Sequence, residues 1–342
     1  MALADTNIDF SKEDWDQPTE FFEGCWVVAT KHNPGLNKAL ELNNRVFVFR
    51  LKNKSGEDTL LVFGVCGPTS IDAVKKLEEQ TGLKVSWIVG NGGGHHLFLA
   101  LWYEAFPNAR ILVPARRIPD TRNGKELEQK YADRWELMTG PKPAQLLEEF
   151  GDQIDVVIFD QLFQYKDQTA AAVADGPKNY ASTPTNLSGF KFLMKMGKVM
   201  KDFSQPNDEV FLFHKRSGLV IAGHNFQLSY EPKGYSPPAK FKMVNGGFPV
   251  NLMMSMLMPK GAFKSMLEGM PAPIEDSKKH LEEWETVLAW DFRAWTSAHD
   301  PPTICGPDKS GPDIKAMIRE SLHRTGEDDP TGARLKWNKK HA

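Results

Sequence analysis

One stretch, residues 85–114, constrains the fold of this chain more than any other. It begins with the apolar run Val85–Val89, which is typical of a buried strand. The three consecutive glycines Gly92–Gly94 follow, and they allow the backbone to turn sharply where the strand ends. The adjacent histidines His95 and His96 come directly after this turn. Two imidazoles at this position lie at the carboxyl edge of a sheet, where α/β folds commonly keep their chemistry. The alternative is a plain helix start with two polar residues.

Length and composition indicate an ordinary globular protein. The chain has 342 residues, of which 41% are hydrophobic and 25% are charged. This length fits one large domain or two small ones. Because strands and helices alternate without a convincing linker, we expect one domain over residues 21–324. A polar N-terminal arm of residues 1–20 precedes it, and a polar tail of residues 325–342 follows it.

Charge and cysteine content restrict the partners and the compartment. A formal net charge of −2 argues against a general nucleic-acid binder, which normally carries a basic surplus. The three cysteines, Cys25, Cys66 and Cys305, are odd in number and far apart, so they do not form a disulfide framework. A reducing, cytoplasmic compartment is the simplest explanation. No apolar run has the length of a membrane helix, so we expect no membrane partner.

The pattern of apolar residues predicts a mixed order of strands and helices. Short apolar or alternating runs predict strands at Trp26–Thr30, Arg45–Leu51, Thr59–Val65, Val85–Val89, Arg110–Val113, Ile154–Phe159, Glu209–Phe213 and Leu219–Ala222. Helical spacing predicts helices at Ser70–Thr81, Leu127–Leu137, Pro141–Phe150, Gly189–Met200, Asn251–Gly269, Ile274–Trp290 and Asp313–Leu322.

Two further histidines occupy positions similar to the His95–His96 pair. His224 follows the strand-like run L-V-I-A-G, and His299 follows the apolar W-T-S-A. All four histidines therefore lie where a strand or helix gives way to a loop. Imidazole is the commonest neutral metal ligand, and scattered histidines that converge at sheet ends often build such sites.

The order of these features resembles the metallo-β-lactamase superfamily. A strand, a glycine-rich turn, a pair ending in His, a helix, the letters F-P-N-A and another strand follow one another. The superfamily carries His-x-His-x-Asp-His after the first strand, and this motif falls here on residues 91–96. The resemblance spans roughly residues 24–322. It implies an αββα sandwich, in which two mixed β-sheets are flanked by helices, and it looks closest to a divergent branch with degenerate motifs.

The resemblance also implies a ligand set. The second metal site of the superfamily uses an Asp-His pair, a bridging Asp and a last His. These positions carry His95, His96, His224 and His299 here, so both carboxylates are replaced by imidazoles. Random decay seldom replaces two ligands by two other good ligands. The resemblance therefore implies one divalent metal ion, zinc or iron, held by four histidines.

The first metal site of the superfamily is not retained. Asn91 and Gly93 stand where the two histidines of His-x-His belong. His214 is the only candidate for the third ligand, and we expect it in a turn between two strands rather than facing the site. Cys66 or a neighbour stands where the superfamily carries a buried Asp. A mononuclear site is therefore expected.

Three functions are compatible with such a site. Four neutral ligands leave the charge of the ion uncompensated, so the ion is a strong Lewis acid that suits hydrolysis of a small ester- or lactone-type carbonyl substrate. All-imidazole coordination equally suits iron, and the alternative is a mononuclear non-haem iron oxygenase or oxidase. A third possibility is a non-catalytic binding or scaffold protein on a decayed enzyme fold, with structural histidines.

Other residues are weaker candidates for the substrate site. Arg116, Arg117 and Arg122 follow a predicted strand and could clamp an anionic substrate, although such arginines more often form a solvated face. The methionine-rich segment 251–269 could form a lid over an apolar substrate. It equally fits core packing or a homodimer contact.

Three polar residues flank the histidines. Asn91 and Asn225 could orient a ligand or a bound water. Asp300 could hydrogen bond to His299 behind the metal, or cap the turn before Pro301. The remaining histidines are expected at the surface, and they are His32, His280, His323 and His341.

Overall fold

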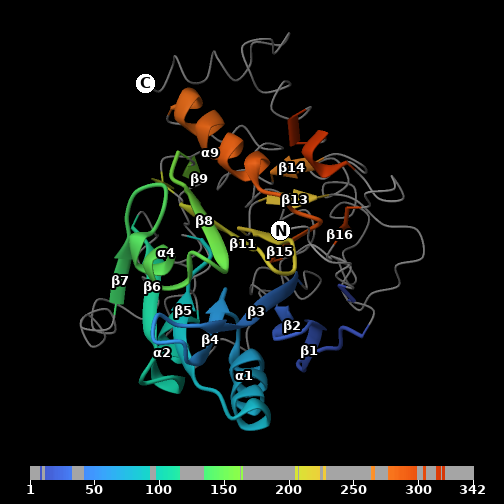
Figure 1. Cartoon of the computed structure of the whole chain (residues 1–342), viewed down its shortest axis with the longest axis vertical. Helices are drawn as coiled ribbons and strands as arrows, with labels where there is room; N and C mark the ends of the chain where they lie inside the picture. Colours follow the sequence, from blue (N-terminus) through green and yellow to red (C-terminus); the bar gives the residue numbers. More distant parts are fainter. Residues whose placement is uncertain are drawn as a thin grey trace, which may run out of the picture.

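Two mixed β-sheets lie face to face, with helices on their outer sides (Figure 1). A computed structural model of the chain describes residues 8–9, 12–32, 42–92, 98–115, 135–161, 163–164, 205–206, 208–223, 226–228, 263–265, 276–298, 303–305, 313–316 and 318–319. The fold class expected from the sequence is confirmed. The division into an arm, a domain of residues 21–324 and a tail stays a prediction.

The first sheet has seven strands in chain order. Neighbouring strands run antiparallel from β1 to β4 and parallel from β4 to β7. The strands are β1 (Pro18–Phe22), β2 (Cys25–His32), β3 (Leu42–Lys52), β4 (Asp58–Phe63), β5 (Val85–Val89), β6 (Arg110–Pro114) and β7 (Trp135–Met138).

The second sheet has five strands in the order β16-β15-β12-β11-β8. Strands β12 and β15 are parallel, and the other neighbours are antiparallel. The strands are β8 (Ile154–Phe159), β11 (Glu209–His214), β12 (Leu219–Ala222), β15 (Ala294–Ser297) and β16 (Thr303–Ile304). Two short pairs accompany it, β9 (Phe163–Gln164) with β10 (Gln205–Pro206) and β13 (Phe226–Leu228) with β14 (Phe263–Ser265).

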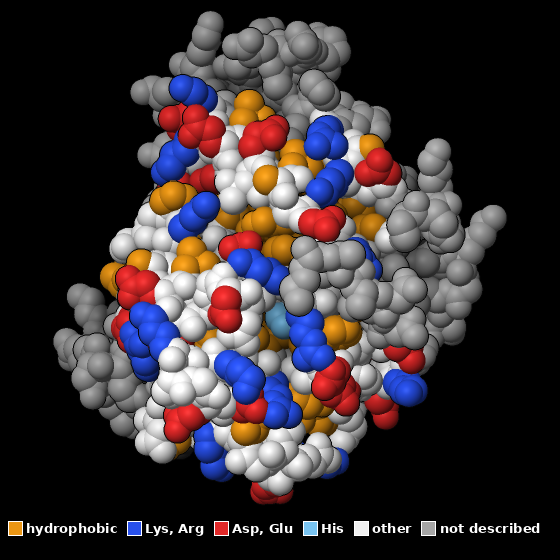
Figure 2. Space-filling view, viewed as in Figure 1, with side chains coloured by type: hydrophobic (Ala, Val, Ile, Leu, Met, Phe, Trp, Pro, Cys, Tyr) orange, Lys and Arg blue, Asp and Glu red, His pale blue; other side chains and the backbone are white. Residues whose placement is uncertain are grey.

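The described surface on the side shown in Figure 2 carries basic and acidic side chains interspersed with one another. Interspersed charges fit the small net charge of the chain and do not build a field of one sign on this face. None of the helices in the described ranges has both the length and the apolar character that a membrane crossing needs. The expected absence of a nucleic-acid partner stays a prediction.

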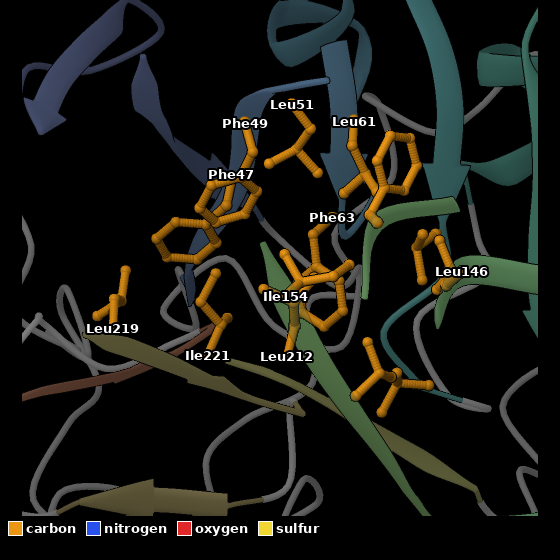
Figure 3. Close-up of a cluster of buried hydrophobic side chains, with 14 of the residues drawn as sticks. Phe47, Phe49, Leu51, Leu61, Phe63, Leu146, Ile154, Leu212, Leu219 and Ile221 are labelled. Atoms are coloured by element: carbon orange, nitrogen blue, oxygen red, sulfur yellow. The ribbon is translucent and has the colours of Figure 1, made fainter. Parts of the chain in front are cut away.

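Alternating side chains build the core between the sheets. In β3, Phe47, Phe49 and Leu51 point toward the second sheet, whereas Val46 and Val48 point outward. This period of two is what a strand produces when both its faces are buried. The inward side chains meet residues of β8, β11 and β12 in one continuous cluster (Figure 3). Each fully buried Leu or Phe contributes about 1.5–3 kcal/mol relative to exposure.

Helices cover the outer face of each sheet (Figure 1). On the first sheet, α1 (Pro68–Thr81) and α2 (Leu99–Ala105) pack their apolar sides against outward residues such as Val48. On the second sheet, α9 (Ser277–Ala289) places Trp284 against the rings of β8 and β11. A further helix, α4 (Ala144–Phe150), precedes β8 and contributes to the central core.

Two ends of the first sheet differ from the sequence expectation. The sheet begins at Pro18–Phe22, inside the segment expected as an arm, and Ile8 is also buried. Trp135–Met138 is the edge strand β7, so the predicted helix at Leu127–Leu137 is wrong at its end. In the structure, exposure alternates between neighbouring residues as in a strand, since Leu137 is 48% exposed and Met138 is 1% exposed.

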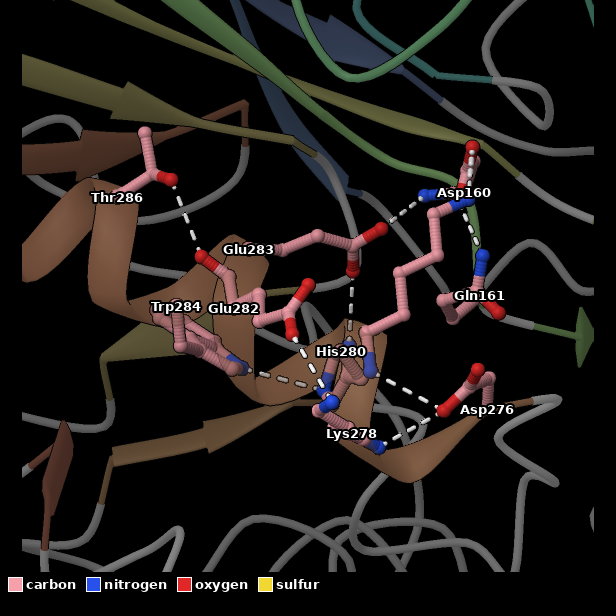
Figure 4. Close-up of polar contacts among 10 residues, drawn as sticks. Asp160, Gln161, Asp276, Lys278, His280, Glu282, Glu283, Trp284 and Thr286 are labelled. Carbon is pink, nitrogen blue, oxygen red and sulfur yellow. Dashed lines mark hydrogen bonds and ion pairs between the residues drawn. The ribbon is translucent and has the colours of Figure 1, made fainter.

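A polar cluster joins α9 to the end of β8 (Figure 4). Glu283 Oε1 accepts a hydrogen bond from the main-chain N–H of Asp160 at 3.0 Å, and Oε2 lies 3.2 Å from His280 Nδ1. Lys279 Nζ forms an ion pair with Asp160 at 2.8 Å. Trp284 Nε1 donates to His280 Nε2 at 3.2 Å. His280 is therefore buried, and its expected place at the surface is wrong.

The two carboxyl groups of this cluster shift in opposite directions. Burial raises the pKa of Glu283 to about 8, although the hydrogen bond from the N–H of Asp160 opposes the shift. Burial alone would raise the pKa of Asp160 too, but hydrogen bonds from Lys279 and Gln161 outweigh it and lower that pKa. Because the folded-state pKa of Glu283 exceeds its ordinary value of 4.5, the stability that neutral Glu283 contributes is complete below pH 4.5. It is lost as the pH rises toward 8.

We predict that Glu283→Gln weakens this pH dependence, because glutamine keeps the shape of the neutral acid and does not ionise. Between about pH 5 and pH 8.5, the wild type should lose on the order of 1–2 kcal/mol of unfolding free energy that the variant keeps. Urea unfolding at both pH values measures the difference. Glu282→Gln, on the exposed side of α9, is the control and should behave as the wild type. Equal pH dependence in Glu283→Gln and wild type would contradict this account.

Candidate functional site

The predicted ligands follow strands whose carboxyl ends share one edge. β12 and β15 are parallel neighbours with Ala222 opposite Ser297, so Gly223 and Ala298 leave the second sheet side by side. β5 is parallel to both of its neighbours in the first sheet and leads to Gly92. Carboxyl ends of parallel strands are where α/β folds bind ligands.

Main-chain contacts join the two sheets at this edge. The N–H of Val210 donates to the carbonyl of Asn91 at 3.0 Å, and Gly92 forms an isolated bridge with Glu209. The N–H of Arg45 donates to the carbonyl of Ala298 at 2.9 Å. The residues that precede all four predicted ligands are therefore held at one place, although they come from different sheets.

Asn91 lies at the base of this edge. Its side chain is buried, with 1% exposure, and its Oδ1 has no hydrogen-bond partner among the residues that the structure describes. Gly64 approaches it closely, since a Cβ on Gly64 would lie 3.4 Å from Asn91 Nδ2. Gly64 also has φ of +85°, which favours glycine. A buried acceptor without a donor is rare in proteins and indicates a place for a further group.

Glu209 is a residue that sequence reasoning missed. It is the first residue of β11 and is 0% exposed. Its carboxyl group lies against Gly223, where an added Cβ would sit 3.0 Å from both Glu209 Cβ and Glu209 Cδ and closer still to Oε2. The only signal in the sequence is an acid that opens an otherwise apolar strand, E-V-F-L-F.

A buried ion pair between Arg45 and Glu13 stabilises the same edge. Arg45 Nε lies 2.7 Å from Glu13 Oε1, and the two side chains are 0% and 1% exposed. Removing both charges from water is costly, so each group depends on the other. Glu13 belongs to the first 20 residues, and this segment therefore takes part in fixing the strand that holds Ala298.

The predicted ligands lie outside the described residues, and so do most of the substrate candidates. The roles that therefore stay predictions are those of His95, His96, His224, His299, Asn225, Arg116, Arg117, Arg122, Asp300 and, apart from Phe263–Ser265, the methionine-rich segment 251–269. Across the described ranges, no group of three or more His, Cys, Asp or Glu side chains is arranged to hold a metal ion. A metal site at this edge would therefore need ligands from outside these ranges, such as the four predicted histidines.

His214 belongs to the core and not to this edge. It is the last residue of β11, about 17 Å along the strand from Glu209. Its Nδ1 lies 2.8 Å from Ser217 Oγ and 3.6 Å from Cys25 Sγ, and its ring lies 5.0 Å from that of Phe49. Burial lowers the pKa of His214 to about 4, and Arg216 adds to the shift. His214 thus lies away from this edge, as expected, and the strand extends one residue further than predicted.

Cys66 is also a core residue rather than a ligand candidate with a free thiolate. Its Sγ lies 2.9 Å from Thr30 Oγ1, and its carbonyl accepts from Trp102 Nε1 at 2.8 Å. Burial raises the pKa of the Cys66 thiol, although the hydrogen bond with Thr30 opposes the shift. A neutral, buried thiol of this kind is inert.

The Arg45–Glu13 pair provides a test of how this edge is held. We predict that Glu13→Ala costs about 3–5 kcal/mol of unfolding free energy, because it leaves the Arg45 guanidinium buried without its carboxylate. Glu23→Ala is the matched control, since it breaks the exposed pair with Arg216 and should cost less than about 1 kcal/mol. Urea denaturation followed by circular dichroism measures both, and similar losses in the two variants would contradict the assigned role.

No family model matches the chain, and no curated protein matches it. Similar solved structures include the mono-zinc form of the metallo-β-lactamase FIM-1 from Pseudomonas aeruginosa, at 9% identity over 92% of this chain and 97% of that one, with a TM-score of 0.43. A metallo-β-lactamase from Hirschia baltica is 6% identical over 90% and 97%, with a TM-score of 0.42. The metal-soaked Flv1 flavodiiron core from Synechocystis sp. PCC6803 is 9% identical over 91% and 62%, with a TM-score of 0.44.

Likenesses of this size describe a broad similarity of chain arrangement and say nothing about activity. The sheet order and the flanking helices of the chain itself give the architecture that its sequence motifs imply. By that architecture, the chain is an αββα sandwich, which is the fold that the resemblance of its sequence implies.

Proposed function

We propose that the protein is a metal-dependent hydrolase of a small ester- or lactone-type carbonyl substrate. The site is a single divalent ion held by His95, His96, His224 and His299. One observation carries the proposal: the residues that precede these histidines, Gly92, Gly223 and Ala298, are held at one edge by contacts between the two sheets.

The described residues fit a metal at this edge in two respects. The buried Oδ1 of Asn91, which no described residue contacts by a hydrogen bond, offers an acceptor to a ligand N–H or to a bound water. The buried carboxyl of Glu209 fills the space beside Gly223, directly before His224. Both groups have the chemistry that commonly surrounds ligating imidazoles. A divalent ion bound here would polarise the carbonyl group of a substrate as a Lewis acid.

The protein's own residues supply positioning and shielding. The contact between Asn91 and Val210 keeps the β5 turn against the second sheet, and the buried side chains of Val89 and Val210 lie beneath it. In the proposal, Arg116, Arg117 and Arg122 bind an anionic part of the substrate, and the segment 251–269 covers an apolar part. Asn225 and Asp300 orient the groups next to His224 and His299.

Metal analysis separates this proposal from its alternatives. We predict about one zinc ion per chain in the wild type, loss of that ion in His224→Ala, and loss of turnover on a panel of aryl esters and lactones in His224→Ala and His96→Ala. His341→Ala, next to the end of the chain, is the matched control and should keep both. Circular dichroism checks that the variants are folded.

The other outcomes point elsewhere. About one iron ion per chain, lost in His224→Ala, would favour the oxygenase or oxidase, which oxygen uptake would then test. Full turnover in folded His96→Ala and His224→Ala would contradict both enzyme proposals. A chain that holds no metal after incubation with zinc or iron, and whose variants lose only stability, would leave the scaffold function.

A further inference from the structure

We propose that Glu209 is a positioning residue of the metal site, which accepts an imidazole N–H from a ligating histidine and balances the charge of the ion. The inference rests on the proposed function, because it assigns a partner to the same four-histidine site. Glu209 was not among the residues that the sequence singled out.

The contacts of Glu209 place it between two ligand-bearing segments. It forms the isolated bridge with Gly92, three residues before His95, and its carboxyl group touches Gly223, one residue before His224. It also pairs with Phe159 of β8, so its main chain is fixed from both sides of β11. Within the described part of the chain, Glu209 thus contacts both segments, Gly92 through its main chain and Gly223 through its side chain.

The chemistry of the ligand set favours a carboxylate near this place, outside the groups that bind the ion directly. Four neutral imidazoles leave the double charge of the ion without a counter-charge, and a buried charge without compensation is costly. Ligating histidines usually donate their second ring N–H to a carboxylate, a carbonyl or a water, which fixes the ring and raises its donor strength. Glu209 is fully buried, so its carboxyl group is shielded from bulk water.

The glycine before His224 fits the same role. An added Cβ on Gly223 would lie 3.0 Å from Glu209 Cβ and Cδ and would collide with Oε2. Real Cβ atoms do not tolerate such contacts, so an alanine would push the carboxyl group away. The carboxyl group of Glu209 therefore occupies the space that a side chain at residue 223 would fill. Gly223→Ala moves this carboxyl group without removing it.

The test measures zinc affinity by competition with a chelator, using the full chain and zinc alone as the probe. We expect Glu209→Gln to bind zinc about 10–100-fold more weakly than the wild type, and Gly223→Ala to weaken binding in the same direction. Glu283→Gln is the matched control, because it makes the same substitution at another buried acid, on α9, and its zinc affinity should be unchanged. Circular dichroism reports whether each variant is folded.

A spectroscopic readout separates positioning from a merely structural role. In cobalt-substituted protein, we expect the visible absorption bands to shift in Glu209→Gln and Gly223→Ala and to stay in place in Glu283→Gln. Wild-type affinity and spectra in folded Glu209→Gln, or in Gly223→Ala if the first variant does not fold, would overturn the role of Glu209 alone. A wild type that binds no zinc or cobalt would overturn the metal site and this role with it.

Discussion

The hydrogen bonds that cross between the two sheets at one edge set the geometry of the molecule. The Val210 N–H meets the carbonyl of Asn91, and the Arg45 N–H meets the carbonyl of Ala298. The two carbonyl groups lie just after the ends of β5 and β15. Because each accepts a main-chain N–H, neither depends on water for a hydrogen bond. As a result, segments more than a hundred residues apart in sequence lie at the same edge of the two sheets. The core between the sheets supplies stability, but this edge determines where chemistry is possible.

Three buried carboxyl groups show how the fold manages charge away from water. Glu13 is paired with Arg45, so its charge is compensated by a permanent cation. Glu283 is kept neutral around pH 7, because burial raises its pKa to about 8. Glu209, in our proposal, faces the histidines of a metal site. Pairing and neutralisation are two physical solutions for a buried acid that the structure shows, and proximity to an ion is the third, which we propose for Glu209.

Local pattern predicted much of the fold and only the outline of the site. The alternation in Arg45–Leu51 predicted β3, because burial on both faces leaves a clear period of two. The local pattern failed at Trp135–Met138. It predicted the end of a helix there, whereas the structure has a short edge strand in which Leu137 is exposed. Glu209 was missed as a site residue, and the core contacts of His214 were not predicted, because their neighbours are remote: Cys25 and His214 are 189 residues apart in sequence. Local sequence patterns do not predict which distant segments pair with each other.

X-ray absorption at the metal edge, on protein loaded with one equivalent of zinc, tests most directly the claim that these strand ends hold one ion between four imidazoles. Our account predicts nitrogen neighbours at about 2.0–2.1 Å, together with the outer-shell scattering of about four imidazole rings. Loss of the scattering of about one imidazole ring in His224→Ala would identify His224 as a ligand. A spectrum dominated by sulfur at about 2.3 Å, or by oxygen neighbours without imidazole scattering, would contradict the four-histidine site.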